Sequence, residues 1–286
     1  MYQAHFGLRE LPFGITPDTS FAFSATSHQE ALNTLLVAAG SGEGFTKITG
    51  EVGTGKTMLC RRFMASLDEG YVCAYLPNPL LEPKGLMHAL AHELHLRVKT
   101  RGDVQVAIEQ LGKSLLRYAE ADKRVLVCID EAQALPPDTL EALRLLTNLE
   151  TEKRKLLQVF LFGQPELDAM LAQDSLRQLR QRITLEYRLQ GLTKPELLLY
   201  LAHRLRVAGY SGRPLFTRRA VDQLYSASMG VPRLVNVLAH KALLLVYGEG
   251  GHEVETKHIK AAVKDTSSAQ RSRFSWWRPG ARRSEE

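Results

Sequence analysis

The sequence predicts an α/β fold with a parallel sheet covered by helices on both faces, followed by a second, all-helical domain. Three observations support this prediction. Strand-like and helical patterns alternate through the first two-thirds of the chain, the strand-like runs are apolar on both faces, and only the helical period continues after residue 193. With 286 residues, of which 44% are hydrophobic and 24% charged, the chain is long enough to bury a sizeable core.

The expected elements follow one another in the order of a doubly covered parallel sheet. The strand-like runs are residues 44–49, 71–76, 124–129, 156–162 and 183–187. Helical patterns between them cover residues 57–64, 83–96, 103–120, 138–150 and 166–180. In the last third, helical patterns cover residues 193–208, 217–228, 232–247 and 256–265, with breaks at 209–214, 230–232 and 248–251.

The first strand-like run leads into an octapeptide with the pattern G-x-x-x-x-G-K-[ST], which is typical of a phosphate-binding loop. Polyphosphate needs a concave set of backbone N–H groups, glycines that let the main chain approach closely, a lysine for the outer phosphates and a hydroxyl for Mg²⁺. The helix that follows would direct its N-terminus at the phosphates. The residues expected to bind a nucleotide are Gly50, Glu51, Val52, Gly53, Thr54, Gly55, Lys56, Thr57 and Met58.

Two acidic residues, Asp130 and Glu131, end the third strand-like run. A strand suits this position because it directs the carboxylate at its C-terminal end toward the phosphate loop. We expect Asp130 to hold Mg²⁺ together with Thr57, and Glu131 to accept a proton from the attacking water. The two motifs together predict nucleotide hydrolysis with Lys56 and Glu131 as catalytic residues, whereas a solvated acidic turn is the alternative interpretation of the acid pair.

Polar residues at the ends of neighbouring elements are candidates for sensing the nucleotide. The fourth strand-like run ends before Gln164 and should lie beside the Asp130 strand, so we expect Gln164 near the attacking water or the terminal phosphate. The alternative is a polar turn residue. Asn148 closes a helical pattern, where it either orients Glu131 or caps the helix end.

Arginines are candidates for offsetting charge on the transferred phosphoryl group. Arg177, Arg180 and Arg182 crowd the region before the last strand-like run, and Arg233 begins a helix of the second domain. Position favours Arg182, which directly precedes a strand at the edge of the core, and Arg233, whose helix is expected to face the nucleotide. Such a guanidinium comes from a neighbouring subunit or a moving domain, which predicts a homo-oligomer.

Composition and charge indicate where the protein is located, the state of its cysteines and which partners it could bind. The most hydrophobic stretch, residues 234–247, is interrupted by polar residues, and the N-terminus lacks a signal-peptide pattern, so we expect a cytoplasmic protein without a transmembrane span. The three cysteines lie in separate apolar segments, as expected of reduced core thiols. Basic residues outnumber acidic ones by 13 to 6 in residues 151–219, which leaves nucleic acid, an acidic membrane surface or a subunit interface open.

The order of these motifs resembles that of the AAA+ ATPases: a phosphate loop, an Asp-Glu strand, a polar sensor strand, an arginine-bearing turn and a helical lid with a G-x-P-R-type second sensor. The resemblance covers roughly residues 44–265. It implies that ATP and Mg²⁺ are bound and that hydrolysis yields ADP and phosphate. It assigns sensor roles to Gln164 and Arg233 and leaves the arginine finger open between Arg182 and Arg180.

The N-terminal segment and the residues around the motifs are similar to those of a narrower family, the ExeA/GspA group of secretion ATPases. The residues that carry this similarity are 2–8, 12–13, 16–18, 28–32 and 42–45, with D-E-A-Q-A-L at 130–135 and F-G-Q-P-E-L at 162–167. Members of this group energise assembly of type II secretion or type IV pilus machinery. The larger members continue into a membrane span and a peptidoglycan-binding domain, whereas this chain ends in a short basic tail, so we expect a soluble, pilus-type relative.

The expected domains are an N-terminal linker and first helix over residues 1–43 that pack on the core, an α/β core over 44–190, a helical lid over 191–265 and a flexible basic tail over 266–286. The resemblance also implies that Phe13 packs near the adenine, and a simple core position is the alternative. In the tail, Trp276-Trp277 among arginines suggests a contact patch.

The leading hypothesis is therefore an AAA+ ATPase that couples ATP hydrolysis to assembly of a pilus or secretion apparatus. Its partners would be assembly proteins at the inner membrane, where a peripheral position is the alternative to a purely cytoplasmic one. A nucleic-acid-handling ATPase for transposition or replication is the first rival, although no DNA-reading domain follows the lid. A nucleotide-dependent scaffold is the second, and the intact Glu131 argues against it.

Overall fold

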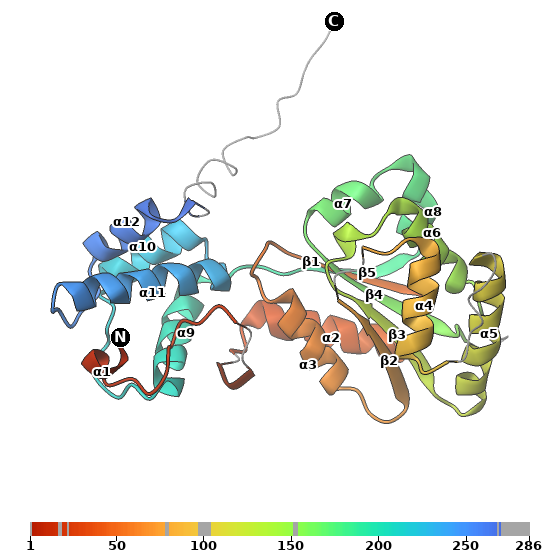
Figure 1. Ribbon diagram of the computed structural model, residues 1–286, viewed down its shortest axis with the longest axis horizontal. Coiled ribbons are helices and arrows are strands. Elements are labelled where there is room, and N and C mark those ends of the chain that lie inside the picture. Colours follow the sequence, from red (N-terminus) through yellow and green to blue (C-terminus); the bar gives the residue numbers. More distant parts are fainter. Residues whose placement is uncertain are drawn as a thin grey trace, which may run out of the picture. The chain divides into compact units, whose positions relative to one another are not determined.

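The structure is a computed structural model that describes residues 2–16, 19–21, 23–77, 80–96, 104–150, 154–267 and 269 (Figure 1). Its contacts divide the chain into two compact units. We call the unit of His28–Glu51 and Gly55–Leu189 the core unit. The helical unit combines the N-terminal residues up to Ser27, the short segment Val52–Thr54 and the residues from Gln190 onward. Trp276-Trp277 of the expected tail lies outside the described residues.

The core unit is built around a five-stranded parallel sheet with the strand order β2-β3-β4-β1-β5. The strands are β1 (Phe45–Thr49), β2 (Tyr71–Leu76), β3 (Arg124–Ile129), β4 (Leu157–Gly163) and β5 (Ile183–Arg188). All five predicted strands are therefore confirmed. The predicted neighbourhood of the Asp130 strand and the Gln164 strand is also confirmed, because β3 pairs with β4.

Helices and short 3-10 turns precede the first strand and connect the strands to one another. They are α2 (Thr26–Ser41), α3 (Lys56–Ala65), α4 (Pro83–Glu93), α5 (Val104–Glu120), η2 (Ala132–Ala134), α6 (Pro137–Leu146), α7 (Glu166–Leu171), η3 (Asp174–Leu176) and α8 (Arg177–Arg180). Helix α6 ends four residues earlier than the sequence pattern predicts: Thr147 is its C-cap, and the Thr147 hydroxyl donates to the Arg144 carbonyl at 2.8 Å.

Both faces of the sheet are apolar and covered by helices, as the sequence predicts. Alternate residues of a strand point to opposite faces. On one face, Val127 and Val159 pack with residues of α4, α5 and α6. On the other, Leu126 and Phe160 pack with α2 and α3, so the core unit has three layers (Figure 1). A sheet covered on both faces needs continuous apolar strands, and β4 is buried along its whole length.

The helical unit contains four long helices in the last third of the chain. They are α9 (Lys194–Val207), α10 (Arg218–Ser228), α11 (Pro232–Gly248) and α12 (Thr256–Lys264), with α1 (Gln3–Phe6) and η1 (Thr19–Phe21) contributed by the N-terminal segment. All four predicted helices are confirmed to within a few residues. None of the described helices is both long enough and apolar enough to cross a membrane.

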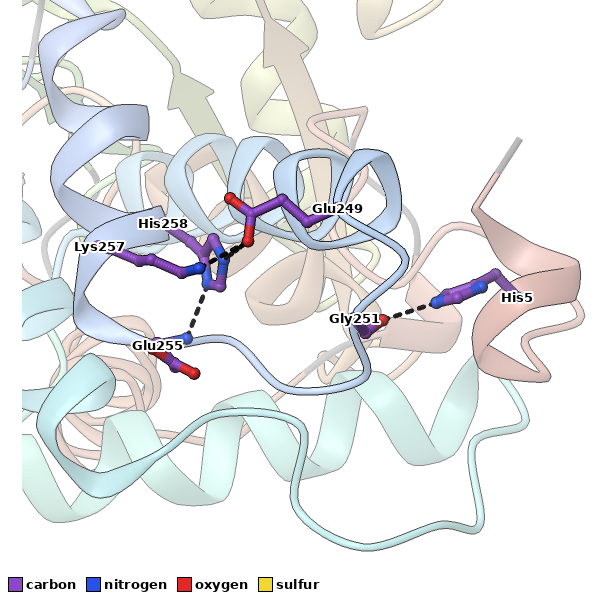
Figure 2. Close-up of polar contacts among 6 residues, drawn as sticks. All are labelled: His5, Glu249, Gly251, Glu255, Lys257 and His258. Carbon is purple, nitrogen blue, oxygen red and sulfur yellow. Dashed lines mark hydrogen bonds and ion pairs between the residues drawn. The ribbon is translucent and has the colours of Figure 1, made fainter.

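The N-terminal segment packs into the core of the helical unit. Tyr2, Phe6 and Phe13 are buried there among the side chains of α9 to α12. The ring of His5 donates a hydrogen bond of 2.7 Å to the carbonyl oxygen of Gly251, in the turn after α11 (Figure 2). The expected linker over residues 1–43 is thus divided: residues up to Ser27 belong to the helical unit, and the remainder of α2 covers the sheet.

The turn between α11 and α12 is closed by polar side chains that Figure 2 shows converging on one carboxylate. Glu249 accepts hydrogen bonds from Lys257 (2.7 Å) and contacts Nε2 of His258 at 3.1 Å. The other ring nitrogen of His258 accepts the backbone N–H of Glu255 at 2.9 Å and so caps the start of α12. This local pairing joins the last two helices of the unit.

Candidate nucleotide-binding and hydrolysis site

The predicted phosphate loop connects β1 to the first turn of α3. Gly50 donates its backbone N–H to the carbonyl of Gly163 at 3.2 Å, which ties the start of the loop to the end of β4. Gly55 is the N-cap of α3 and offers no side chain to the first N–H groups of that helix. These groups have no partner within a helix, and they are suited to an anion.

Glycine is required at residue 55 for two physical reasons. Its φ of 98° lies in the left-handed region, where a side chain is strained. A Cβ atom there would also lie 2.8 Å from Nε2 of His28, a residue of α2. The close approach of main chain and imidazole places His28 beside the loop, a neighbour that the motif alone does not reveal.

Lys56 is 5% exposed, and its ammonium group points at the main chain of the loop. Its Nζ donates to the carbonyl oxygens of Gly50 at 2.8 Å and Glu51 at 3.1 Å. Burial lowers the pKa of Lys56, although the carboxylates of Glu131 and Asp130 act in the opposite direction. A buried cation held by loop carbonyls has the position and charge needed to meet a phosphate.

Asp130 is 3% exposed and has hydrogen-bond partners at both carboxylate oxygens. Its Oδ2 accepts the Thr57 hydroxyl at 2.5 Å and the Tyr75 hydroxyl at 3.4 Å. Its Oδ1 accepts the backbone N–H of Glu131 at 3.0 Å. A hydroxyl and a carboxylate side by side form the oxygen set that Mg²⁺ prefers, so the residues present fit that ion.

The Tyr75 hydroxyl stays protonated beside this carboxylate. Burial, and secondarily the negative charge of Asp130, raise the pKa of Tyr75 to about 12. Tyr75 lies on β2, next to β3 in the sheet, and therefore donates to Asp130 across neighbouring strands. Tyr75 has no recognisable signal in the sequence, because its strand carries no motif.

Glu131 is the second residue after β3, and its backbone is left-handed with φ 53°. Its Oε2 accepts two amide donors, Nε2 of Gln133 at 2.6 Å and Nε2 of Gln164 at 2.8 Å. Burial opposes ionisation, yet these two hydrogen bonds and the charge of Lys56 leave the pKa of Glu131 lowered. The carboxylate is thus ionised and fixed in orientation, as a proton acceptor must be.

Of the two roles left open for Asn148, the structure does not support the orientation of Glu131. Asn148 lies exposed after the end of α6, and the carboxylate is oriented by Gln133 and Gln164 instead. Gln164 reaches it because β3 and β4 are adjacent. No role was predicted for Gln133, although it is the glutamine of the D-E-A-Q-A-L segment directly after the β3 strand.

The candidate arginines of the core unit lie around α8. Arg177 and Arg180 are exposed. Arg182 is half-buried and donates, at 3.4 Å in each case, to the Arg144 carbonyl and the Thr147 hydroxyl. The described hydrogen bonds do not join these arginines to Lys56 or Glu131 of the same chain, and their role as a finger stays a prediction.

Besides Val52–Thr54 of the phosphate loop, two further predicted site residues, Arg233 and Phe13, belong to the helical unit. Arg233, in the first turn of α11, donates its backbone N–H to the Gly53 carbonyl at 3.2 Å within that unit. A Cβ atom at Gly53, whose φ is 84°, would lie 2.3 Å from Cβ of Arg233. Phe13 is 1% exposed and its ring packs edge-on against Phe216, so it occupies the core position that was its alternative interpretation, and adenine contact stays a prediction.

Comparisons with known proteins agree with this arrangement. A family model described as an AAA domain matches residues 38–171. General secretion pathway protein A of Aeromonas hydrophila is 41% identical over 267 residues, which cover 93% of this chain and 49% of that protein. The chain therefore spans about half the length of this relative.

Solved structures share the fold at low sequence identity. Cdc6p from Pyrobaculum aerophilum has a TM-score of 0.64 and 16% identity, over 87% of this chain and 71% of that chain. The ORC2 protein of Aeropyrum pernix has a TM-score of 0.59 and 16% identity, over 88% of this chain and 72% of that chain. By its sequence, the chain belongs to the AAA+ proteins of the ExeA/GspA group.

Proposed function

We propose that this chain hydrolyses ATP and uses the energy to assemble a type II secretion apparatus or an MSHA-like type IV pilus. The observation that carries the hydrolytic part is the Glu131 carboxylate, held ionised by two amide donors in the same unit as Lys56 and the Thr57–Asp130 pair. The assembly part is supported by 41% identity to a protein named for general secretion.

Binding would begin with the phosphates of ATP. The N–H groups at the start of α3 and the buried Lys56 ammonium would hold the β- and γ-phosphates. Thr57 and Asp130 would hold Mg²⁺, which when bound neutralises charge on the phosphates. The hydroxyl and carboxylate are already in contact at 2.5 Å, so little rearrangement of the protein is needed.

Hydrolysis would use Glu131 as the general base. The carboxylate takes a proton from the water that attacks the γ-phosphorus, while the bond between that phosphorus and the ADP oxygen breaks. Gln164 would orient the same water or contact the terminal phosphate. Its side chain already reaches Glu131 at 2.8 Å, which supports a position near the attacking water.

Arginines would connect ATP hydrolysis to movement of the subunits and of the helical lid. We propose that Arg182, with Arg180 as the alternative, reaches the γ-phosphate bound by a neighbouring subunit, and that Arg233 acts from the helical lid. This shared site predicts a homo-oligomer. The chain would work in the cytoplasm, at the inner-membrane face of the apparatus, with pilus or secretion assembly proteins as partners.

Steady-state ATPase measurements on wild type and Glu131→Gln test the hydrolytic part. We expect turnover to fall by about 10²-fold or more while ATP binding is retained, because only the proton acceptor is removed. Equal turnover in the two proteins would leave a nucleotide-dependent scaffold as the better explanation. Adding duplex DNA across a salt series tests the nucleic-acid alternative, for which stimulation that fades with salt is expected.

A complementation experiment tests the assembly part. In a strain lacking this chain, wild type should restore surface pili or secretion and Glu131→Gln should not. The neighbouring genes give an independent check, since pilus components beside this gene favour the MSHA-like function. Full restoration by Glu131→Gln would separate assembly from hydrolysis and contradict the proposal.

A further inference from the structure

The side chain of Gln133 contacts both proposed water-handling residues, Glu131 and Gln164, and the D-E-A-Q-A-L segment that contains it assigns it no chemical role. It lies in the middle of η2, the turn that follows Glu131. Its Nε2 donates to Oε2 of Glu131 at 2.6 Å, and its Oε1 accepts the backbone N–H of Gln164 at 3.0 Å. One amide therefore bridges the ends of β3 and β4.

These two contacts determine the orientation of the Gln133 amide. A half-turn about its last bond would set the amide oxygen against the Glu131 carboxylate and the NH₂ group against the N–H of Gln164. Both contacts would then be repulsive, because acceptor would face acceptor and donor would face donor. The bridge consequently holds Glu131 in one geometry relative to the main chain of β4.

The donors converge on a single carboxylate oxygen. Nε2 of Gln164 reaches Oε2 of Glu131 at 2.8 Å, the atom that Gln133 also contacts. Among the described residues, the side-chain hydrogen bonds to this carboxylate all end on Oε2. This arrangement leaves the lone pairs of Oε1 to accept a proton from water.

The Gln133 amide has a second hydrogen bond that does not depend on the side chain of Gln164. Its second contact is a backbone N–H, which does not change when the Gln164 side chain rotates. The main chain at Gly163 leaves room for this contact, since a Cβ atom there would lie 3.3 Å from Oε1 of Gln133 and 2.6 Å from Cδ2 of Leu167. Gln133 can thus keep Glu131 oriented while the Gln164 side chain turns to contact the terminal phosphate.

We propose that Gln133 is a positioning residue for hydrolysis, which orients the Glu131 carboxylate so that Oε1 receives the proton of the attacking water. The inference rests on the proposed ATPase function and adds a residue that controls its general base. A physical consequence follows from the contact itself. Hydrogen bonds to a carboxylate stabilise its charged form, so loss of Gln133 raises the pKa of Glu131.

Steady-state kinetics on the full chain provide the first test, with Gln133→Ala compared with wild type from pH 5 to 9. We expect kcat to fall about tenfold or more, KM to stay within about twofold, and the acidic limb of the kcat profile to move to higher pH. Gln173→Ala changes an exposed glutamine of the same unit and should match wild type. Unchanged kcat, or a loss of kcat without movement of the acidic limb, would overturn the inference.

A titration that needs no turnover keeps this inference separable from the proposed function. In protein labelled with ¹³C at glutamate side-chain carboxyls, the Glu131 signal is assigned by its loss in Glu131→Gln. Its titration midpoint should be higher in Gln133→Ala than in wild type. If wild type fails to hydrolyse ATP, the proposed function fails while the midpoint still tests the contact; an unmoved midpoint in an active enzyme overturns the Gln133 role alone.

Gln133→Asn serves where the alanine variant does not fold. It keeps an amide but is shorter by one methylene, so it cannot span both Glu131 and the N–H of Gln164. Folding is checked by far-ultraviolet circular dichroism and thermal unfolding. A folded Gln133→Asn with the wild-type pH profile and midpoint would contradict the positioning role.

Discussion

The Thr57 hydroxyl donates a hydrogen bond to Oδ2 of Asp130 over 2.5 Å, which joins the first turn of α3 to the end of β3. These residues are 73 positions apart in the chain. They meet because parallel pairing of β1 and β3 with β4 brings the carboxyl ends of the strands to one edge of the sheet. The contact is the part of the site best suited to Mg²⁺.

Replacing Thr57 should remove the advantage that Mg²⁺ gives to ATP binding. We expect Thr57→Ala to lower ATP affinity in Mg²⁺ by about tenfold or more, because one oxygen ligand is lost, and to change affinity little in EDTA. Isothermal titration calorimetry in both buffers measures the difference. Thr57→Ser keeps the hydroxyl and is the matched control; equal Mg²⁺ dependence in all three proteins would contradict the metal role.

The proposed finger predicts that two inactive subunits can restore each other. Glu131→Gln supplies an intact arginine, and Arg182→Ala supplies an intact base, so a mixed oligomer contains some complete sites. We expect each variant alone to lose about 10²-fold or more in ATPase rate and the mixture to regain a measurable part.

Arg180→Ala distinguishes the two finger candidates in the same assay. Arg180 is exposed, whereas Arg182 is half-buried and bonded to the Arg144 carbonyl. Recovery with Arg180→Ala in place of Arg182→Ala would assign the finger to Arg180. A mixture that stays inactive in both cases would argue against a shared site.

Gly230→Ala should destabilise the helical unit. A Cβ atom at this residue would lie 2.0 Å from the Leu192 carbonyl oxygen, and its φ of 73° disfavours a side chain. We expect the free energy of unfolding to fall by about 2 kcal/mol or more, measured by urea denaturation. Gly248→Ala is the control, because nothing lies within 4 Å of the added atom at that helical residue. A loss no larger than that of the control would show that the backbone relaxes.

Stability of the helical unit should depend on the ionisation of Glu196. This residue forms a capping box with Thr193 at the start of α9 and also accepts the backbone N–H of Thr26 at 2.8 Å. Burial opposes ionisation, but these hydrogen bonds lower the pKa of Glu196 to about 2. Because the folded pKa lies below the unfolded value of about 4.3, the stabilisation is present above that value and is lost as pH falls toward 2.

Thermal unfolding of wild type and Glu196→Gln between pH 6 and 2 measures this contribution. The glutamine keeps the shape and an acceptor oxygen but carries no charge, so its unfolding temperature should fall less over the acidic part of the range. Glu10→Gln, at an exposed residue of the same unit, is the control. If the unfolding temperatures of wild type and Glu196→Gln fall equally with pH, the prediction is contradicted.

Much of the fold could be predicted from the sequence because its signals are local. The apolar runs of β3 and β4 require burial on both faces, and the breaks at Gly209 and Gly230 end helices through positive backbone φ. The phosphate loop is also local, since one octapeptide contains its glycines, its lysine and its hydroxyl. Helix ends were less predictable, as α6 shows, because a few hydrogen bonds decide where a last turn stops.

The sequence by itself determined the element order and the two covered faces of the sheet, and it predicted Lys56, Thr57, Asp130 and Glu131 as the site residues. Only the tertiary structure decided that Gln133 and Gln164 hold the Glu131 carboxylate and that the N-terminal segment packs with the helical unit. The reason is physical: a motif specifies atoms that lie close along the chain, whereas these contacts depend on strand pairing and apolar packing between distant segments.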